Sequence, residues 1–174
     1  KTARDVVKNI DWKKSFVQYS YRPFDDRRIV YLPALIERDR LEIMQHLLDK
    51  DNLALSLTRR LRDQNWKHVF ATHFVTDKTL LSSRDNCYCF PLYLYQRKEK
   101  TKKSSMKNIM MLFEPEADYF VRRPNISPSL LERLTKTFKK TPSPEEIFYY
   151  IYAVLYSETY RTHYSEFLKI DFPR

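Results

Sequence analysis

The sequence of 174 residues contains no glycine. Average usage of about 7% predicts roughly a dozen glycines in a chain of this length. A Walker A loop and a dinucleotide-binding fingerprint both need glycine where the backbone approaches a phosphate or a ribose, so neither can be present. Turns must therefore be built from Asn, Asp, Ser and Pro. We expect them at 49–52, at Asp85 and Asn86, and at Pro124 and Asn125.

Basic residues outnumber acidic ones, with 32 Lys and Arg against 22 Asp and Glu, and the net charge is +10. Such a chain is attracted to polyanions, of which nucleic acid is the commonest inside cells. The alternative is a basic surface that only maintains solubility. Because 43% of the residues are hydrophobic, we expect 1–174 to form a single globular domain that buries roughly 70% of its unfolded surface.

Two cysteines, Cys87 and Cys89, are the only ones in the chain. They could supply two zinc ligands beside His68 or His73, but two thiols on one face of a strand more often pack in a core. We expect reduced thiols in a cytoplasmic protein. The apolar run 147–156 is about half a membrane span, so no membrane partner is expected. Since the chain lacks an initiator Met, we expect it to be a piece of a longer protein.

Hydrophobic periodicity predicts an α+β domain, with a mixed or antiparallel sheet in the first half and helices in the last third. Leucines alternate along the strand 52–59, and Pro91 indicates an edge or a bulge. Pro23 with Asp25 and Asp26 should form a bend, in which Arg22 and Asp25 have a structural role. Strands are predicted over 15–20, 28–32, 52–59, 68–76 and 87–95, and helices over 2–12, 39–48, 127–138, 143–156 and 160–168.

The predicted helices contain two sets of apolar side chains that we assign to the core. The first is a stripe at helical spacing and the second is rich in aromatic rings, which dominate packing in cores. The stripe consists of Leu130, Leu131, Leu134 and Phe138, and the aromatic set of Phe148, Tyr149, Tyr150, Tyr152 and Tyr156.

Catalytic motifs for DNA chemistry are missing. Asp11, Trp12 and Lys13 form the acid–X–Lys part of a nuclease motif, but the upstream Pro-Asp pair is absent. Amino methylation of a base needs a motif with two consecutive prolines, and the chain has none. The sequence therefore predicts neither DNA cleavage nor methyl transfer by this segment.

Basic and amide side chains are instead distributed as in a DNA-binding surface. Arg forms two parallel hydrogen bonds with guanine, Asn does so with adenine, and Lys holds phosphates. The alternative for each residue is a solvated charge with no partner role, and for the run 97–107 a flexible connector. The candidates are Arg59 and Arg60 after a strand, Arg84 and Asn86 in a loop between strands, Arg122 and Arg123 in another loop, and Lys98, Lys100, Lys102 and Lys103 for nonspecific contact.

Several ordered blocks resemble the C-terminal specificity domain of type ISP restriction-modification enzymes. They begin with YRPFD at 21–25 and IER at 36–38, and continue with NLAL at 52–55 and FPLYLY at 90–95. Two longer blocks, 144–155 and 160–174, complete the resemblance, which covers the chain from about Tyr19 onward.

The resemblance implies a target recognition domain from a large single-chain enzyme that also carries a nuclease, a helicase-like ATPase and an adenine methyltransferase. The expected partners are double-stranded DNA and the methyltransferase and helicase domains of the same parent chain. No cofactor is expected in this segment, whereas the parent would use S-adenosylmethionine, ATP and Mg²⁺. The alternatives are an interaction module that docks those domains without reading bases and, less favoured, a free-standing nuclease.

Overall fold

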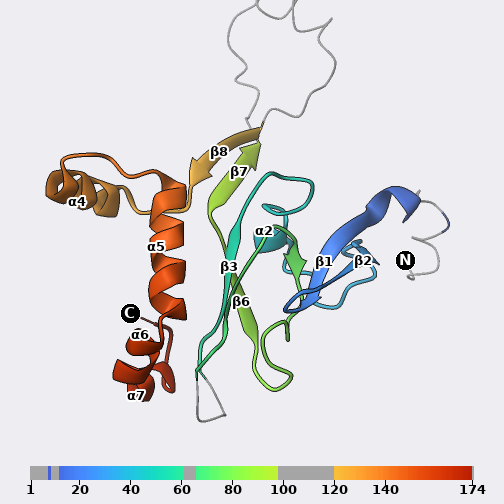
Figure 1. The fold of residues 1–174 in the computed structure, drawn as a ribbon. Helices are drawn as coiled ribbons and strands as arrows, with labels where there is room; N and C mark the ends of the chain where they lie inside the picture. Colours follow the sequence, from blue (N-terminus) through green and yellow to red (C-terminus); the bar gives the residue numbers. More distant parts are fainter. Residues whose placement is uncertain (1–7, 9–11, 61–65, 98–119, 174) are drawn as a thin grey trace, which may run out of the picture.

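The computed structural model describes residue 8 and residues 12–60, 66–97 and 120–173. Its elements form three layers (Figure 1). A central antiparallel sheet has the order β4 (Val69–Thr72), β3 (Ala54–Thr58), β6 (Cys87–Pro91). One face is covered by α5 (Pro144–Tyr156) and α7 (Ser165–Leu168), and the other by a second sheet and α2 (Leu41–Met44). The predicted α+β class is confirmed.

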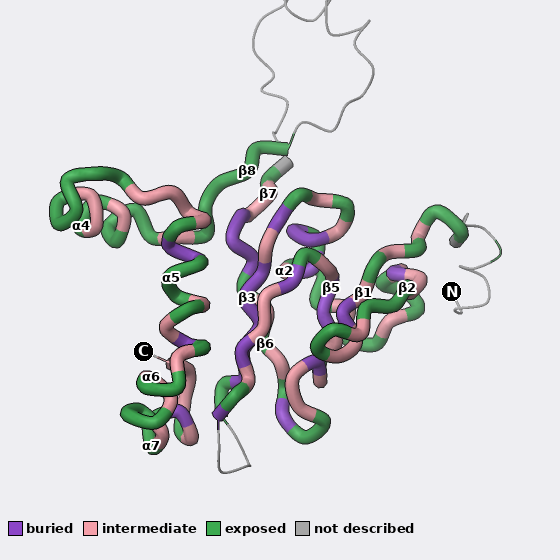
Figure 2. Tube along the Cα trace, in the orientation of Figure 1, coloured by how far each residue is buried: buried purple, intermediate pink, exposed green. Residues whose placement is uncertain are grey.

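Strand β3 is buried on both faces, as Figure 2 shows. Leu55 and Leu57 pack with Phe148, Leu155 and Leu168 of the helices. Ala54, on the opposite face, belongs to a separate core with residues of α2 and the second sheet. The alternation of leucines predicts only the first of these faces, because the small side chains on the other face carry no such signal.

The second sheet has the order β2 (Asp25–Val30), β1 (Phe16–Arg22), β5 (Val75–Thr76), with β2 antiparallel and β5 parallel to β1. A 3₁₀ turn, η1 (Trp12–Ser15), precedes it, and the helix predicted over 2–12 lies almost wholly outside the described residues. The bend contains Pro23 and Phe24 alone, since Asp25 and Asp26 are already in β2.

Arg22 and Asp25 lie opposite each other in the register of β1 and β2, but each pairs with another charged residue. The guanidinium of Arg22 lies 3.2 Å from the carboxylate of Asp77, and Asp25 pairs with Arg27 at 2.7 Å. Both arginines stack over the ring of Tyr21 at 4.0 Å.

Two predicted strands are each divided between two sheets. The stretch 68–76 splits at His73 and Phe74, where the chain leaves the central sheet as β4 and joins β1 as β5. The stretch 87–95 splits at Leu92 into β6 and β7 (Tyr93–Arg97). Pro91 ends β6, an edge strand, as predicted.

The assignment of Arg122 and Arg123 to a loop is wrong. Both lie in β8 (Phe120–Pro124), which pairs antiparallel with β7, so that Arg122 is opposite Tyr95 and Arg123 opposite Leu94. All five residues of β8 are exposed. Because the strand is short, exposed and rich in charge, it lacks the apolar alternation that identifies strands in a sequence.

The helix predicted over 39–48 is a single turn, α2, followed by further turns. It starts after Arg40, which has a left-handed backbone and no side-chain cap. Beyond Met44, i−3 hydrogen bonds such as that between the Leu47 N–H and the Met44 carbonyl, at 2.9 Å, occur together with an i−4 bond from Leu48. The segment nevertheless buries Met44, His46 and Leu47.

The C-terminal helices begin where the sequence indicates. Ser127 caps α4 (Pro128–Phe138), and Ser143 with Glu146 forms a complete capping box on α5. The third predicted helix is two short ones, α6 (Glu158–His163) and α7. Among the described residues no helix is long and apolar enough to span a bilayer.

The predicted buried stripe of α4 is exposed or half-buried. Leu130 is 39% exposed and Phe138 67%, and no residue of α4 is buried. Figure 1 shows why: α4 projects from the body beside β8. Of the aromatic set on α5 only Phe148 is buried, whereas Tyr149, Tyr150 and Tyr156 are exposed, because the sheet covers one side of the helix only.

Left-handed backbone positions, which glycine usually occupies, are filled here by larger residues. Phe24, Arg38, Arg40, Asp49 and Lys139 have φ between 51° and 64°. Asp49 confirms the predicted turn at 49–52. Each such residue costs about 1 to 2 kcal/mol relative to right-handed backbone, so the absence of glycine leaves strain at the turns.

Candidate nucleic-acid interface

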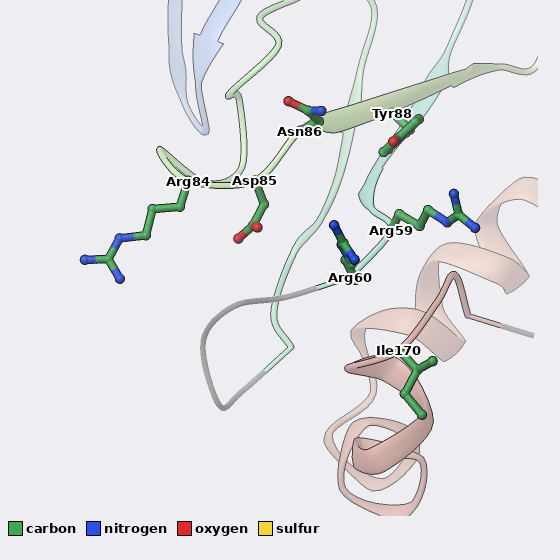
Figure 3. A pocket seen from close by; sticks show the side chains of 7 residues that line it. All are labelled: Arg59, Arg60, Arg84, Asp85, Asn86, Tyr88 and Ile170. Carbon is green, nitrogen blue, oxygen red and sulfur yellow. The ribbon is translucent and has the colours of Figure 1, made fainter.

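Four of the predicted DNA-binding residues line one cleft of about 340 Å³, at the end of the central sheet opposite β8 (Figures 1 and 3). Arg59 and Arg60 come from the end of β3, and Arg84 and Asn86 from the loop before β6. The structure therefore brings together two segments that are separated by the whole of β4 and β5. The full lining comprises Arg59, Arg60, Arg84, Asp85, Asn86, Tyr88 and Ile170.

Arg59 and Arg60 follow directly on the fully buried Thr58, and both side chains are exposed. Arg59 points toward the C-terminal helical segment (Figure 3). Its Nε donates a hydrogen bond of 2.8 Å to Oδ1 of Asp171. This hydrogen bond raises the pKa of the Arg59 guanidinium, which therefore remains charged.

The loop 77–86 is anchored at both ends. At its start, Asp77 accepts hydrogen bonds from the hydroxyls of Tyr19 and Thr79. Although burial raises the pKa of Asp77, these hydrogen bonds hold it below its ordinary value. At its end, the Cys87 N–H donates to the Lys78 carbonyl at 2.7 Å, and Leu80 between them is fully buried.

The anchored loop presents Arg84 and Asn86 to solvent. Ser82 Oγ donates to the carboxylate of the buried Asp85 at 3.1 Å and accepts from the Arg84 N–H at 3.2 Å, which fixes the backbone at the tip. Arg84 extends away from the other lining residues, while Asn86 lies at the start of β6 (Figure 3). The backbone at the tip is therefore fixed, while both Arg84 and Asn86 are exposed.

Arg122 and Arg123 form a second group at the other end of the molecule (Figure 1). The guanidinium of Arg122 stacks 4.2 Å from the ring centre of Tyr93, and a hydrogen bond with Tyr95 raises its pKa. Arg123 is exposed, and its charge helps to lower the pKa of His46. The predicted residues Lys98, Lys100, Lys102 and Lys103 lie outside the described residues.

The cysteines are half-buried on β6, which pairs with β3. Cys87 pairs with Thr58 in the register and Cys89 with Ser56. Burial raises the pKa of Cys87 to about 12 and that of Cys89 to about 11. Within the part of the chain that the structure describes, three potential ligands of the His, Cys, Asp and Glu types do not gather at any point.

Sequence reasoning missed Asp85, Tyr88 and Ile170 in the lining of the cleft, and Asp171 as the partner of Arg59. Asp171 is 112 residues from Arg59. Nothing local marks a carboxylate near the end of a helical segment as the partner of an arginine at the end of a strand. The block 160–174, which contains Asp171, was the only indication that this part of the chain mattered.

The fold and the cleft define an α+β domain with an arginine-rich site at one end of its central sheet. A family model described as "Type ISP C-terminal specificity domain" matches residues 1–174. The chain belongs to this family. A search of curated proteins finds no match.

Solved structures of two type ISP enzymes and of one further DNA complex are similar to the chain. LlaBIII bound to DNA has 21% identity and a TM-score of 0.67, and the match covers 92% of this chain and 9% of that one. The DrdV-DNA complex has 26% identity and a TM-score of 0.69, and the match covers 93% of this chain and 14% of that one. A nuclease-deletion mutant of LlaGI with a DNA substrate mimic has 20% identity and a TM-score of 0.61, and the match covers 92% of this chain and 12% of that one. The chain thus spans 9 to 14% of the length of these proteins.

Proposed function

We propose that this chain recognises the target sequence of double-stranded DNA on behalf of a larger, cytoplasmic type ISP restriction-modification enzyme. The adenine methyltransferase, nuclease and helicase-like parts lie elsewhere in that polypeptide. S-adenosylmethionine, ATP and Mg²⁺ serve those parts. The domain itself acts as a reader, and the methyltransferase extrudes the adenine that it modifies.

The convergence of Arg59, Arg60, Arg84 and Asn86 on one cleft is the observation that carries this proposal. Three guanidinium groups concentrate positive charge at a single end of a chain whose net charge is +10. The similar structures are complexes with DNA or with a DNA substrate mimic, which supports duplex DNA as the polyanion.

The residues of the cleft divide into two roles in this proposal. Arg84 and Asn86, on the anchored loop, contact base edges in the major groove, while Arg60 holds a phosphate. Arg122 and Arg123 on β8 form a second region of contact, and Lys98, Lys100, Lys102 and Lys103 contact phosphates without regard to sequence.

Selection of the full-length protein on a randomised duplex pool, followed by sequencing, tests the proposal. We expect an enriched site, together with a steep fall in affinity with salt. Arg84→Ala should relax preference at one position by about 1 to 3 kcal/mol, and Arg60→Ala should weaken all sequences alike and reduce the salt slope by about 1. Arg28→Ala, which removes one exposed charge from β2, outside both the cleft and β8, serves as the control.

A second candidate, a docking module for the other parts of the parent enzyme, is favoured by the exposed apolar stripe of α4. A module of this kind has no sequence preference and little salt dependence of duplex binding. A pool that emerges from selection without enrichment would refute the reader and favour the docking module.

A further inference from the structure

We infer that Asp171 is a positioning residue that makes Arg59 a specificity-determining contact for DNA. This inference rests on the proposed function and extends it from the loop 77–86 to the C-terminal segment. Asp171 itself does not touch DNA. It sets the plane in which the Arg59 guanidinium meets a base edge.

The geometry of the pair leaves the binding edge of Arg59 accessible. The contact of 2.8 Å uses Nε of Arg59, so the edge formed by the two Nη groups is the one that can recognise guanine O6 and N7. A guanidinium is planar, so a hydrogen bond at one edge fixes the direction of the other N–H groups. The Arg59 side chain is 56% exposed, which is compatible with a second partner.

Asp171 is itself held firmly. Its Oδ1 also accepts a hydrogen bond of 2.9 Å from the Phe172 N–H. The ring of Phe172 packs edge-on against Tyr88 and Phe90 of β6, with centroid distances of 5.1 and 5.7 Å. Leu168, three residues earlier, is only 1% exposed. The carboxylate therefore stands at a fixed place beside the strand that borders the cleft.

Charge distinguishes positioning from simple attraction. A carboxylate beside the cleft repels phosphates and reduces the general affinity of the site for DNA. An arginine whose only role is to attract the backbone would bind more tightly without this neighbour. Readout of a base needs two parallel hydrogen bonds in one orientation, and a fixed partner at Nε supplies that orientation.

The test is Asp171→Asn in the full-length protein, with the selected duplex and a scrambled duplex of the same composition as probes. The measured quantity is the discrimination ratio, which is the Kd for the scrambled duplex divided by the Kd for the selected one. We expect this ratio to fall by about 5-fold or more, the lower end of the value of a bidentate base contact. Affinity for the scrambled duplex should equal or exceed that of the wild type.

Glu166→Gln provides a matched control. Glu166 lies in α7 and pairs with Lys169 at 2.7 Å, so its replacement removes the same charge from the same segment without affecting Arg59. The discrimination ratio of this variant should remain that of the wild type. Asp171→Asn should also have no further effect in an Arg59→Ala background, because the two residues act as a unit.

Arg59→Lys keeps the fold testable if Asp171→Asn unfolds the segment. This change retains the charge but removes the planar fork, so discrimination should fall while the salt slope is kept. Unchanged discrimination in both Asp171→Asn and Arg59→Lys overturns the inference, as does an equal loss in Asp171→Asn and Glu166→Gln. Absence of any preference in the wild-type protein instead refutes the proposed function, and the inference with it.

Discussion

Replacing Asn52 with alanine should destabilise the fold by about 4 kcal/mol. The side chain of Asn52 is buried and joins three parts of the molecule. Its Nδ2 donates to the carbonyls of His46 and Tyr93, both at 2.8 Å. Its Oδ1 accepts from the N–H groups of Leu53 at 2.9 Å and Tyr93 at 3.0 Å.

The magnitude follows from these four hydrogen bonds. Each is worth about 1 kcal/mol net, and more where a buried partner is left unsatisfied. A domain of this size has a free energy of unfolding of about 5 to 15 kcal/mol, so the loss is a large part of the total. Asn125→Ala is the matched control, because its Nδ2 makes one hydrogen bond, of 3.0 Å to the Pro91 carbonyl, from an exposed residue. It should cost about 1 kcal/mol.

Urea unfolding, followed by far-UV circular dichroism, measures both variants. The reasoning requires that the midpoint falls much further for Asn52→Ala than for Asn125→Ala, with the slope of the transition unchanged. Equal midpoints would refute it. Asn52→Asp is a second variant for the same test. Its carboxylate would face the carbonyl oxygens of His46 and Tyr93, which raise its pKa in the folded state, so this variant alone should gain stability as the pH falls.

Three further predictions concern the turns, the pH response and the exposed helix. Lys139→Gly should stabilise the chain by about 1 kcal/mol, because the φ of 53° at Lys139 suits glycine. Lys136→Gly, inside α4, should instead cost about 1 kcal/mol, so the urea midpoints of the two variants should shift in opposite directions. Burial, with a contribution from Arg123, lowers the pKa of His46 below 6.5. The folded state therefore binds fewer protons than the unfolded one, and the free energy of unfolding should decline as the pH falls below 6.5. His46→Gln should flatten that decline, and an unchanged pH profile would show that His46 is not its cause. Phe138 is 67% exposed, so Phe138→Ala should lower the free energy of unfolding by less than about 1 kcal/mol, whereas Phe148 is 6% exposed and Phe148→Ala should lower it by about 3 to 5 kcal/mol. Comparable losses of the two variants in thermal denaturation would indicate that α4 is covered.

Elements with local signals were predictable from the sequence. The capping box at Ser143 and Glu146 marks the start of α5 to the residue, and the alternating leucines mark β3. The α+β class follows from the order of these patterns. Such signals depend on side chains a few residues apart, and they operate whatever the rest of the chain does.

Features set by distant partners could not be predicted. The pattern of apolar residues in the run 68–76 gives no sign that the strand is divided between two sheets. At the point of division the Phe74 N–H donates to Thr72 Oγ1, and His73 Nδ1 lies 2.8 Å from the Asn52 carbonyl. The prediction that the stripe on α4 is buried is wrong, because periodicity does not say what covers an apolar face. Here the described residues leave it uncovered.

The candidate site was predicted in part. Residue type and position near strand ends were enough to select Arg59, Arg60, Arg84 and Asn86, which the fold gathers into one cleft. The same reasoning selects Arg122 and Arg123 as DNA-binding residues, but the fold places them on β8, at the end of the molecule opposite the cleft. Whether any of these residues contacts DNA stays a prediction.

The anchoring of the cleft has a consequence for protein engineers who wish to transplant recognition between relatives. Moving the loop 77–86 alone would leave behind Tyr19, which holds its first residue, and the pair of Arg59 and Asp171 beside the same cleft. The smallest portable cassette is therefore discontinuous: the donor must contribute Tyr19 of β1, the end of β3, the loop with β6, and the last residues after α7 together.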